Sequence, residues 1–120
     1  EYIMKKTFIL FIILTFVLAA CGKKYDKEIE QVTKLEQKSV EDSQADNRKK
    51  VNRNSSDYKV YDNGNVITMT IVPFEDSDMT TTRVYRLNKT NQKYEEDLSE
   101  NVTEYQQSNK PDYEENNLEK

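Results

Sequence analysis

The chain has 120 residues, 18 of them basic and 22 acidic, a length that allows one domain at most. It contains no histidine and a single cysteine, which excludes a Ser-His-Asp or Cys-His nucleophile system, a Cys/His zinc site and an internal disulfide. The net charge of −4 is concentrated in residues 95–120, which contain nine acidic residues and only two basic ones, Lys110 and Lys120. No concentrated basic face favours nucleic-acid binding.

Residues 1–20 have the pattern of a secretory signal peptide. Met4 is the expected translation start, followed by Lys5, Lys6 and an uncharged run of 14 residues from Thr7 to Ala20. A membrane-spanning helix needs roughly 20 apolar residues, whereas a signal core needs about 7–15. The pattern therefore predicts a cleaved signal, and residues 1–3 are interpreted as an upstream extension. A membrane-spanning helix and an ordinary secreted protein are the alternatives.

The segment Leu18-Ala19-Ala20-Cys21-Gly22 resembles the lipobox of bacterial lipoproteins. The resemblance implies cleavage between Ala20 and Cys21 and a diacylglycerol group on the cysteine sulfur. Two acyl chains suffice for stable anchoring, so we expect the protein at the extracytoplasmic face of the cell membrane. Residues 21–24 would form a short lipidated tether, and removal of residues 1–20 would leave 16 basic and 21 acidic residues.

Residues 25–52 are predicted to form one long helix. One face, an arc of about 160°, contains the apolar residues Tyr25, Ile29, Val32, Leu35, Val40 and Val51. The apolar face is thin near its end, so a break near Asp46-Asn47 remains open. The basic cluster Arg48–Arg53 is interpreted as a solvated helix end that suits the helix dipole; a polyanion site is the alternative.

Beyond Ser56 the hydrophobic period becomes strand-like and predicts four strands, at residues 58–61, 66–72, 80–87 and 93–96. Asp62-Asn63-Gly64-Asn65 is a strong hairpin signal, because Asn-Gly tolerates the positive φ angles of a type I′ turn. Ile67, Met69 and Ile71 point to one side of their strand. We expect this side to meet the helix at Ile29, Val32 and Leu35.

The predicted fold is α+β: a long N-terminal helix packed on a four-stranded antiparallel sheet, within a domain at residues 25–107. A short helical turn is expected around Leu98, Val102 and Tyr105. Residues 108–120 are predicted to form an acidic, flexible tail that is frayed or extended.

The mature pattern resembles a family of small bacterial lipoproteins with a cystatin-like fold, described as a domain of unknown function. The similar segments are Cys21–Ile29, Tyr58–Gly64 and Asn109–Tyr113. The resemblance implies a helix wrapped by an antiparallel sheet and no assigned activity. Some such lipoproteins lie among conjugation or mobile-element genes, which implies an accessory or exclusion role.

We expect a non-catalytic module, without cofactor or metal, that binds a protein partner or envelope component beside the membrane. The candidate interaction surface is the exposed sheet face near Tyr58, Tyr61, Tyr85 and Tyr94. Tyrosine is common at recognition surfaces, although it is also an ordinary residue of strands.

Two other functions are less compatible with this sequence. A carboxylate-based hydrolase would use a pair such as Asp76 and Asp78, or Glu95 and Glu96, but adjacent acids in turns are usually solvated. A cystatin-type protease inhibitor would need a Gln-x-Val-x-Gly loop, which Asp62-Asn63-Gly64 does not resemble. The acids at residues 75–78 lack the Asp-x-Asp-x-Asp-Gly spacing of a calcium loop.

Overall fold

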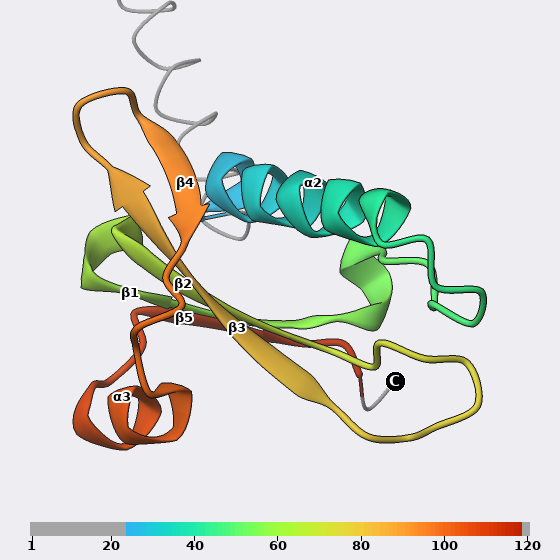
Figure 1. Cartoon of the computed structure of the whole chain (residues 1–120). Helices are drawn as coiled ribbons and strands as arrows, with labels where there is room; N and C mark the ends of the chain where they lie inside the picture. Colours follow the sequence, from blue (N-terminus) through green and yellow to red (C-terminus); the bar gives the residue numbers. More distant parts are fainter. Residues whose placement is uncertain (1–23, 119–120) are drawn as a thin grey trace, which may run out of the picture.

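The computed structural model of the chain describes residues 24–118 (Figure 1). The predicted signal peptide, its cleavage site at Ala20 and Cys21, and the tether up to Lys23 lie outside the described residues. Among residues 24–118, no helix has the length and apolar character that crossing a membrane requires. The elements follow in the order α2 (Asp26–Asp42), η2 (Arg53–Ser55), β1 (Asp57–Tyr61), η3 (Asp62–Gly64), β2 (Val66–Ile71), β3 (Thr81–Asn88), β4 (Lys93–Glu96), α3 (Val102–Ser108) and β5 (Tyr113–Asn116).

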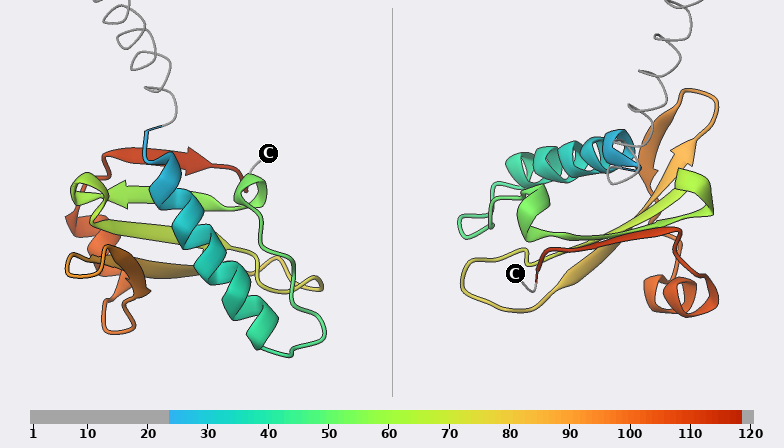
Figure 2. Two further views of the ribbon diagram at one scale, coloured as in Figure 1. Left: turned by 90° about the horizontal axis from the view of Figure 1, so that it is seen from above. Right: turned by 180° about the vertical axis from the view of Figure 1, so that it is seen from behind.

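The strands form one antiparallel sheet in the order β4-β3-β2-β1-β5. α2 crosses one face of this sheet, and the short α3 covers part of the opposite face (Figures 1 and 2). The predicted α+β class, with an N-terminal helix on an antiparallel sheet, is therefore confirmed. The predicted count of four strands was one too few.

The hairpin between β1 and β2 forms where the Asn-Gly signal predicted it. Asp62, Asn63 and Gly64 all have positive φ angles, of 51°, 54° and 93°. Such angles suit glycine and asparagine far better than other residues. The turn places Val60 opposite Ile67, which in turn faces Tyr85 on β3.

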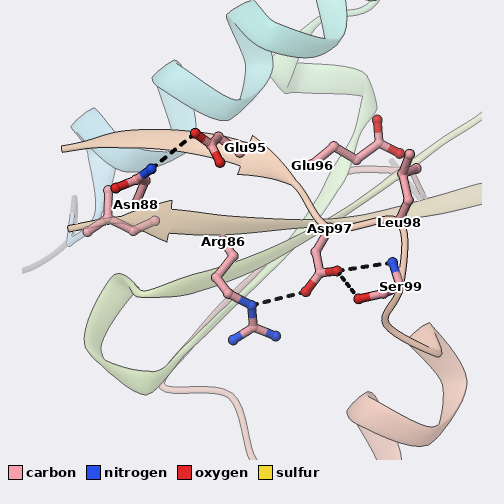
Figure 3. Close-up of a pocket in the computed structure, with 8 residues that line it drawn as sticks. Arg86, Asn88, Glu95, Glu96, Asp97, Leu98 and Ser99 are labelled. Carbon is pink, nitrogen blue, oxygen red and sulfur yellow. Dashed lines mark hydrogen bonds and ion pairs between the residues drawn. The ribbon is translucent and has the colours of Figure 1, made fainter. Parts of the chain in front are cut away.

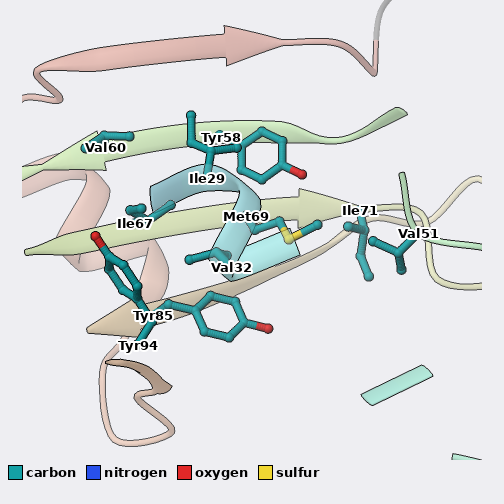
Figure 4. Packing of buried hydrophobic residues seen from close by; sticks show 10 residues of the cluster. All are labelled: Ile29, Val32, Val51, Tyr58, Val60, Ile67, Met69, Ile71, Tyr85 and Tyr94. Carbon is teal, nitrogen blue, oxygen red and sulfur yellow. The ribbon is translucent and has the colours of Figure 1, made fainter. Parts of the chain in front are cut away.

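The main core lies between α2 and the sheet (Figure 4). Its buried members are Ile29, Val32, Val51, Tyr58, Val60, Ile67, Met69, Ile71, Tyr85 and Tyr94. The predicted contact of Ile67, Met69 and Ile71 with the helix is confirmed for Ile29 and Val32. It is wrong for Leu35, which is 37% exposed. The buried stripe of α2 continues through Thr33 and Glu36 instead.

A smaller core lies on the other face of the sheet, under α3. Tyr61, Val66 and Val84 pack there against Val102 and Tyr105 of the helix. The rings of Tyr61 and Tyr105 meet edge-on with centroids 5.0 Å apart. The predicted helical turn around Val102 and Tyr105 is thus confirmed, whereas Leu98 lies outside it and is exposed.

The helix predicted over residues 25–52 was too long, because α2 ends at Asp42. The backbone N–H and the hydroxyl of Ser43 both bond the Val40 carbonyl, and Gln44 turns the chain with a positive φ of 58°. Val51 still reaches the core, but from the loop that follows. Val51 fits the helical period of the sequence, but it is tertiary packing of the loop that buries it.

Arg48 and Arg53 are not part of a solvated helix end, which corrects the interpretation of the basic cluster. Arg48 lies in the irregular segment after α2, and Arg53 begins the short helix η2; their side chains are only 14% and 21% exposed. Arg48 points to a buried carboxylate on α2. Arg53 binds three carboxylates at once, from Asp26, Glu30 and Glu115.

The Arg53 contacts attach the C-terminal segment to the domain. β5 pairs with β1, with Tyr113 opposite Val60, so the predicted tail contributes an edge strand and the predicted domain end at residue 107 leaves it out. The Asn117 amide also donates to the Arg53 carbonyl, at 3.0 Å. The hydrogen bonds from Arg53 lower the pKa of the Glu115 carboxyl. In turn, the carboxylates of Glu115, Asp26 and Glu30 raise the pKa of Arg53, and Glu115 contributes most.

We predict that Glu115→Gln destabilises the fold by about 1–2 kcal/mol at neutral pH, because it removes a charged partner of Arg53. The folded-state pKa of Glu115 is depressed, so its stabilisation is present above the unfolded pKa of about 4.3 and is lost as the pH falls through the lower folded value. Urea unfolding at about pH 7 and about pH 3 should show the difference from wild type shrinking in acid.

Glu114→Gln is the matched control, because Glu114 is half exposed and pairs with Lys59 at 3.8 Å. Its effect should stay within about 0.5 kcal/mol. Equal costs for the two variants, or a cost for Glu115→Gln that grows in acid, would contradict the role of the Arg53 contacts.

Candidate interaction site

The four tyrosines predicted to mark an exposed surface are buried, which overturns that candidate site. Tyr58, Tyr61, Tyr85 and Tyr94 are 0%, 2%, 2% and 5% exposed. Three of them belong to the core under α2, and Tyr61 belongs to the core under α3. Both faces of the sheet are covered where these residues stand, so their rings serve as core volume.

Each tyrosine hydroxyl under α2 has a polar partner. Tyr58 meets the Thr33 hydroxyl at 2.6 Å, Tyr85 donates to Glu36 at 2.6 Å, and Tyr94 donates to the Gly64 carbonyl. Burial raises the pKa of all three phenols, that of Tyr94 to about 12. These hydroxyls are therefore neutral; those of Tyr58 and Tyr85 fix the helix on the sheet, and that of Tyr94 fixes the β1–β2 turn.

Glu36 is the most unusual side chain under α2, because its carboxylate is fully buried. Arg83 Nε lies 2.9 Å from one carboxylate oxygen and Arg48 Nη2 lies 3.8 Å from the other. Neither contact has hydrogen-bond geometry, so they are ion pairs, and Tyr85 supplies the one direct hydrogen bond. The Arg48 guanidinium also stacks over Phe74, 5.4 Å from the ring centre.

The buried role of Glu36 was not predicted, although the sequence contains a signal for it. Glu36 follows Val32 by four positions and Ile29 by seven, so it continues the apolar stripe of the helix. A carboxylate at such a position needs a buried cation. Arg83, at an inward position of β3, was the available partner.

The surface offers a different candidate site, beside the hairpin of β3 and β4. A hollow of about 450 Å³ opens there (Figure 3). Its lining residues are Arg86, Leu87, Asn88, Glu95, Glu96, Asp97, Leu98 and Ser99. This hollow has no local signal in the sequence, because it depends on how the chain leaves β4 and turns toward α3.

Polar contacts fix the groups on one side of the hollow. Arg86 Nε donates to Asp97 at 3.1 Å, and Asp97 also accepts bonds from the backbone N–H and hydroxyl of Ser99. Ser99 and then Arg86 lower the pKa of the Asp97 carboxyl, which is therefore a carboxylate at neutral pH. Between these residues, the Leu98 side chain is 85% exposed.

This arrangement suits recognition better than chemistry. The hollow presents a positioned guanidinium, a positioned carboxylate and one exposed apolar side chain. The Ser99 hydroxyl donates to Asp97, and no histidine exists to act as its base. We therefore take Arg86, Asp97, Leu98 and Ser99 as the candidate interaction site.

The carboxylate pairs considered for a hydrolase are exposed, although Glu95 and Glu96 also line the hollow. Asp76 and Asp78 are exposed, and Asp76 accepts a bond from Asn47. Glu95 accepts from Asn88, and Glu96 pairs with Arg83. None of these acids lies in an apolar pocket, the environment that a general acid requires. No cluster of three or more metal-ligating side chains occurs within residues 24–118.

The helix on a twisted antiparallel sheet, with both faces partly covered, defines a cystatin-like α+β domain. The chain belongs to the family described as a domain of unknown function with cystatin-like fold (DUF4467), which matches residues 25–117. The family resemblance noted from the sequence is thereby confirmed for this domain.

The crystal structure of a DUF4467 family protein from Staphylococcus aureus subsp. aureus Mu50 has the same fold. It is 24% identical in sequence, with a TM-score of 0.72, and the alignment covers 78% of this chain and 97% of that one. No curated protein matches the chain at a significant level. The likeness shows the fold.

We predict that Glu36→Gln destabilises the fold by about 3 kcal/mol, because it leaves two cations under α2 without their carboxylate. Urea unfolding followed by circular dichroism measures the loss. Glu41→Gln is the control, since Glu41 is exposed on the same helix, and should change stability by less than about 0.5 kcal/mol. A Glu36→Gln variant as stable as wild type would mean that the buried charge contributes nothing.

Proposed function

We propose that this protein is a lipid-anchored lipoprotein of the cell envelope, working as a non-catalytic binding module at the outer face of the cytoplasmic membrane. The observation that carries the proposal is the segment Leu18-Ala19-Ala20-Cys21-Gly22, which directly follows a charged start and an apolar core. A secretory signal that ends in this motif is the pattern of diacylglycerol attachment, and two acyl chains give stable anchoring.

The position of the domain in the chain supports an anchor at Cys21. α2 begins at Asp26, so only four peptide units separate Cys21 from Tyr25. Four residues span at most about 14 Å. Tyr25 is itself fixed, because its ring packs beneath the main core and lies 6.1 Å from the ring of Tyr113. A lipid on Cys21 would therefore keep the whole domain close to the membrane surface.

The binding role rests on the candidate interaction site. Leu98 is the most exposed of the large apolar side chains described, and Arg86 beside it is already positioned by Asp97. Arginine is enriched among the residues that dominate protein interfaces, and a positioned side chain loses little conformational freedom on binding. Burial of an exposed leucine adds the hydrophobic contribution of its side chain. We propose a protein partner in or near the envelope. An accessory or exclusion role in conjugation is one setting in which such a module would act.

A cystatin-type inhibitor is less well supported. Such an inhibitor needs a free hairpin loop, whereas Gly64 in the β1–β2 turn is buried under the Tyr25 ring. The Tyr94 hydroxyl bonds the Gly64 carbonyl and ties the turn to β4. The hollow also gives no support for a hydrolase, because it is open to solvent and its Ser99 hydroxyl donates to the Asp97 carboxylate.

We predict that Cys21→Ser abolishes lipidation. In cells fed an alkyne-labelled fatty acid, the wild-type chain should carry the label and its mature mass should include diacylglycerol, whereas the variant should carry neither. A variant with Cys21→Ser and Ser39→Cys is the control, because it keeps one thiol at an exposed site on α2. Label that does not travel with the wild-type chain, or that follows the displaced thiol, would contradict the anchor.

We predict that Leu98→Asp lowers the yield of a partner cross-linked in intact cells by about tenfold, the loss expected for one well-packed apolar contact of about 1.4 kcal/mol. Met79→Asp is the control, because Met79 is 76% exposed in the loop between β2 and β3 and should have no effect. The yields are compared by quantitative mass spectrometry. Equal losses in the two variants, or none, would remove the hollow from consideration.

A further inference from the structure

The tip of the β3–β4 hairpin, residues 89–93, is a surface to which the proposed role assigns nothing. Its sequence is Lys89-Thr90-Asn91-Gln92-Lys93, and all five residues are exposed. From Leu87 to Tyr94 the chain contains no acid. Within residues 24–118, neither lysine of the tip forms an ion pair. The tip therefore presents two unneutralised ammonium groups on a polar, uncharged background.

The tip lies at the end of the domain where the described chain begins. Tyr94, one residue beyond the tip, donates to the Gly64 carbonyl, and Gly64 lies under the Tyr25 ring. Asn91 is three residues from Tyr94, which corresponds to about 10 Å along a strand. Figure 1 shows the hairpin rising beside the first turns of α2, on the face of the sheet that this helix covers. Both views of Figure 2 agree with that placement.

The tip is also rigid. Asn88 accepts a bond from the Thr90 N–H, Asn91 accepts one from the Lys93 N–H, and Gln92 donates to the Lys89 carbonyl. These side-chain bonds fix the loop before any contact is made. A contact through the tip would therefore order only the two lysine side chains, a small entropic cost.

We infer that this tip is a second membrane contact, which binds the anionic headgroups of the bilayer that the lipid on Cys21 would enter. The inference rests on the proposed lipid anchor. A tether of at most about 14 Å keeps Tyr25 near the surface, and the tip projects from the same end of the domain. An anchored domain meets the headgroups at a high effective concentration, so weak contacts count.

The expected strength follows from the charge. One lysine near an anionic surface favours contact about fivefold, so two lysines favour it about 30-fold. Acids at this end lie behind the tip: Glu95 accepts a bond from Asn88, and Glu28 lies near Tyr94 on the α2 side. This modest bias would fix the orientation of an anchored domain without adding to its anchoring.

The test uses the mature lipidated chain in vesicles of phosphatidylcholine, with or without phosphatidylglycerol. Lipid blocks Cys21, so Thr90→Cys supplies a unique thiol for an environment-sensitive dye. Headgroup-attached quenchers should reduce its fluorescence only in the anionic vesicles, and salt should weaken the effect. Lys89→Glu with Lys93→Glu should lower the ratio of contacting to free tip by more than about 30-fold, because it removes two attractions and adds two repulsions. Lys38→Glu, at an exposed site in the second half of α2, should leave it unchanged.

A dye at Thr80→Cys, in the loop at the opposite end of the strands, should stay unquenched. Equal quenching at the two dye positions, or quenching of the tip that ignores the lysine reversals, would overturn the tip contact alone. A wild-type chain that does not float with the vesicles would overturn the lipid anchor, and the tip contact with it. The two failures are thus distinguishable.

Discussion

The way α2 is seated on three tyrosines of the sheet determines most of this structure. The helix buries few aliphatic side chains completely, with Ile29 and Val32 the main ones, and each contributes only about 1.5–3 kcal/mol. The rest of the contact is made by tyrosine rings whose hydroxyls must find partners. A buried hydroxyl without one costs about 1–3 kcal/mol. Tyr58 and Tyr85 can therefore be buried only where the helix presents Thr33 and Glu36.

That requirement extends outward from the helix. A buried Glu36 carboxylate needs cations, and these come from β3 through Arg83 and from the following loop through Arg48. Drawing Arg48 inward brings its segment alongside the end of β2, where the backbone of Arg48 pairs with Phe74 and its guanidinium stacks on the ring. The loop then returns Val51 to the core and delivers Arg53 to β5. One buried charge and one partly buried arginine thus organise the segment between α2 and β1, whose only helical element is the three-residue η2.

The parts of the fold that could be predicted from the sequence are those with local causes. Alternating residues mark β1 to β4, and Asn63-Gly64 marks the turn between the first two. The end of α2 could be placed only roughly, from the thin apolar face that left a break near Asp46-Asn47 open, because Arg48 and Val51 are drawn inward by partners far away in sequence. β5 carries almost no apolar signal, and it forms because Glu115 meets Arg53 and its backbone completes the edge of β1.

The candidate site also combines features with local sequence signals and features that only tertiary structure decides. Tyrosines on strands are equally compatible with an exposed face and with a core, and only the positions of α2 and α3 decide between them. The hollow beside Leu98 depends on the path from β4 to α3, for which the sequence contains no local signal. By contrast, the Cys21 motif is local and needs no fold to be recognised, so the anchor is a stronger inference from sequence than any interaction surface.

The two faces of the domain suggest how an anchor and a binding site would operate together. α2, the first residues of the domain and the β3–β4 tip lie on one side of the sheet, whereas α3 lies on the other (Figure 1). Arg86 follows Tyr85 on β3, and since Tyr85 faces α2, Arg86 projects toward the α3 side, where it binds Asp97 in the lining of the hollow. A membrane approached through the first side would leave the hollow open to a partner. The sheet would then act as a rigid spacer between the membrane and the partner. Buried side chains fix its strands to both α2 and α3, so the two faces of the sheet keep one relative orientation.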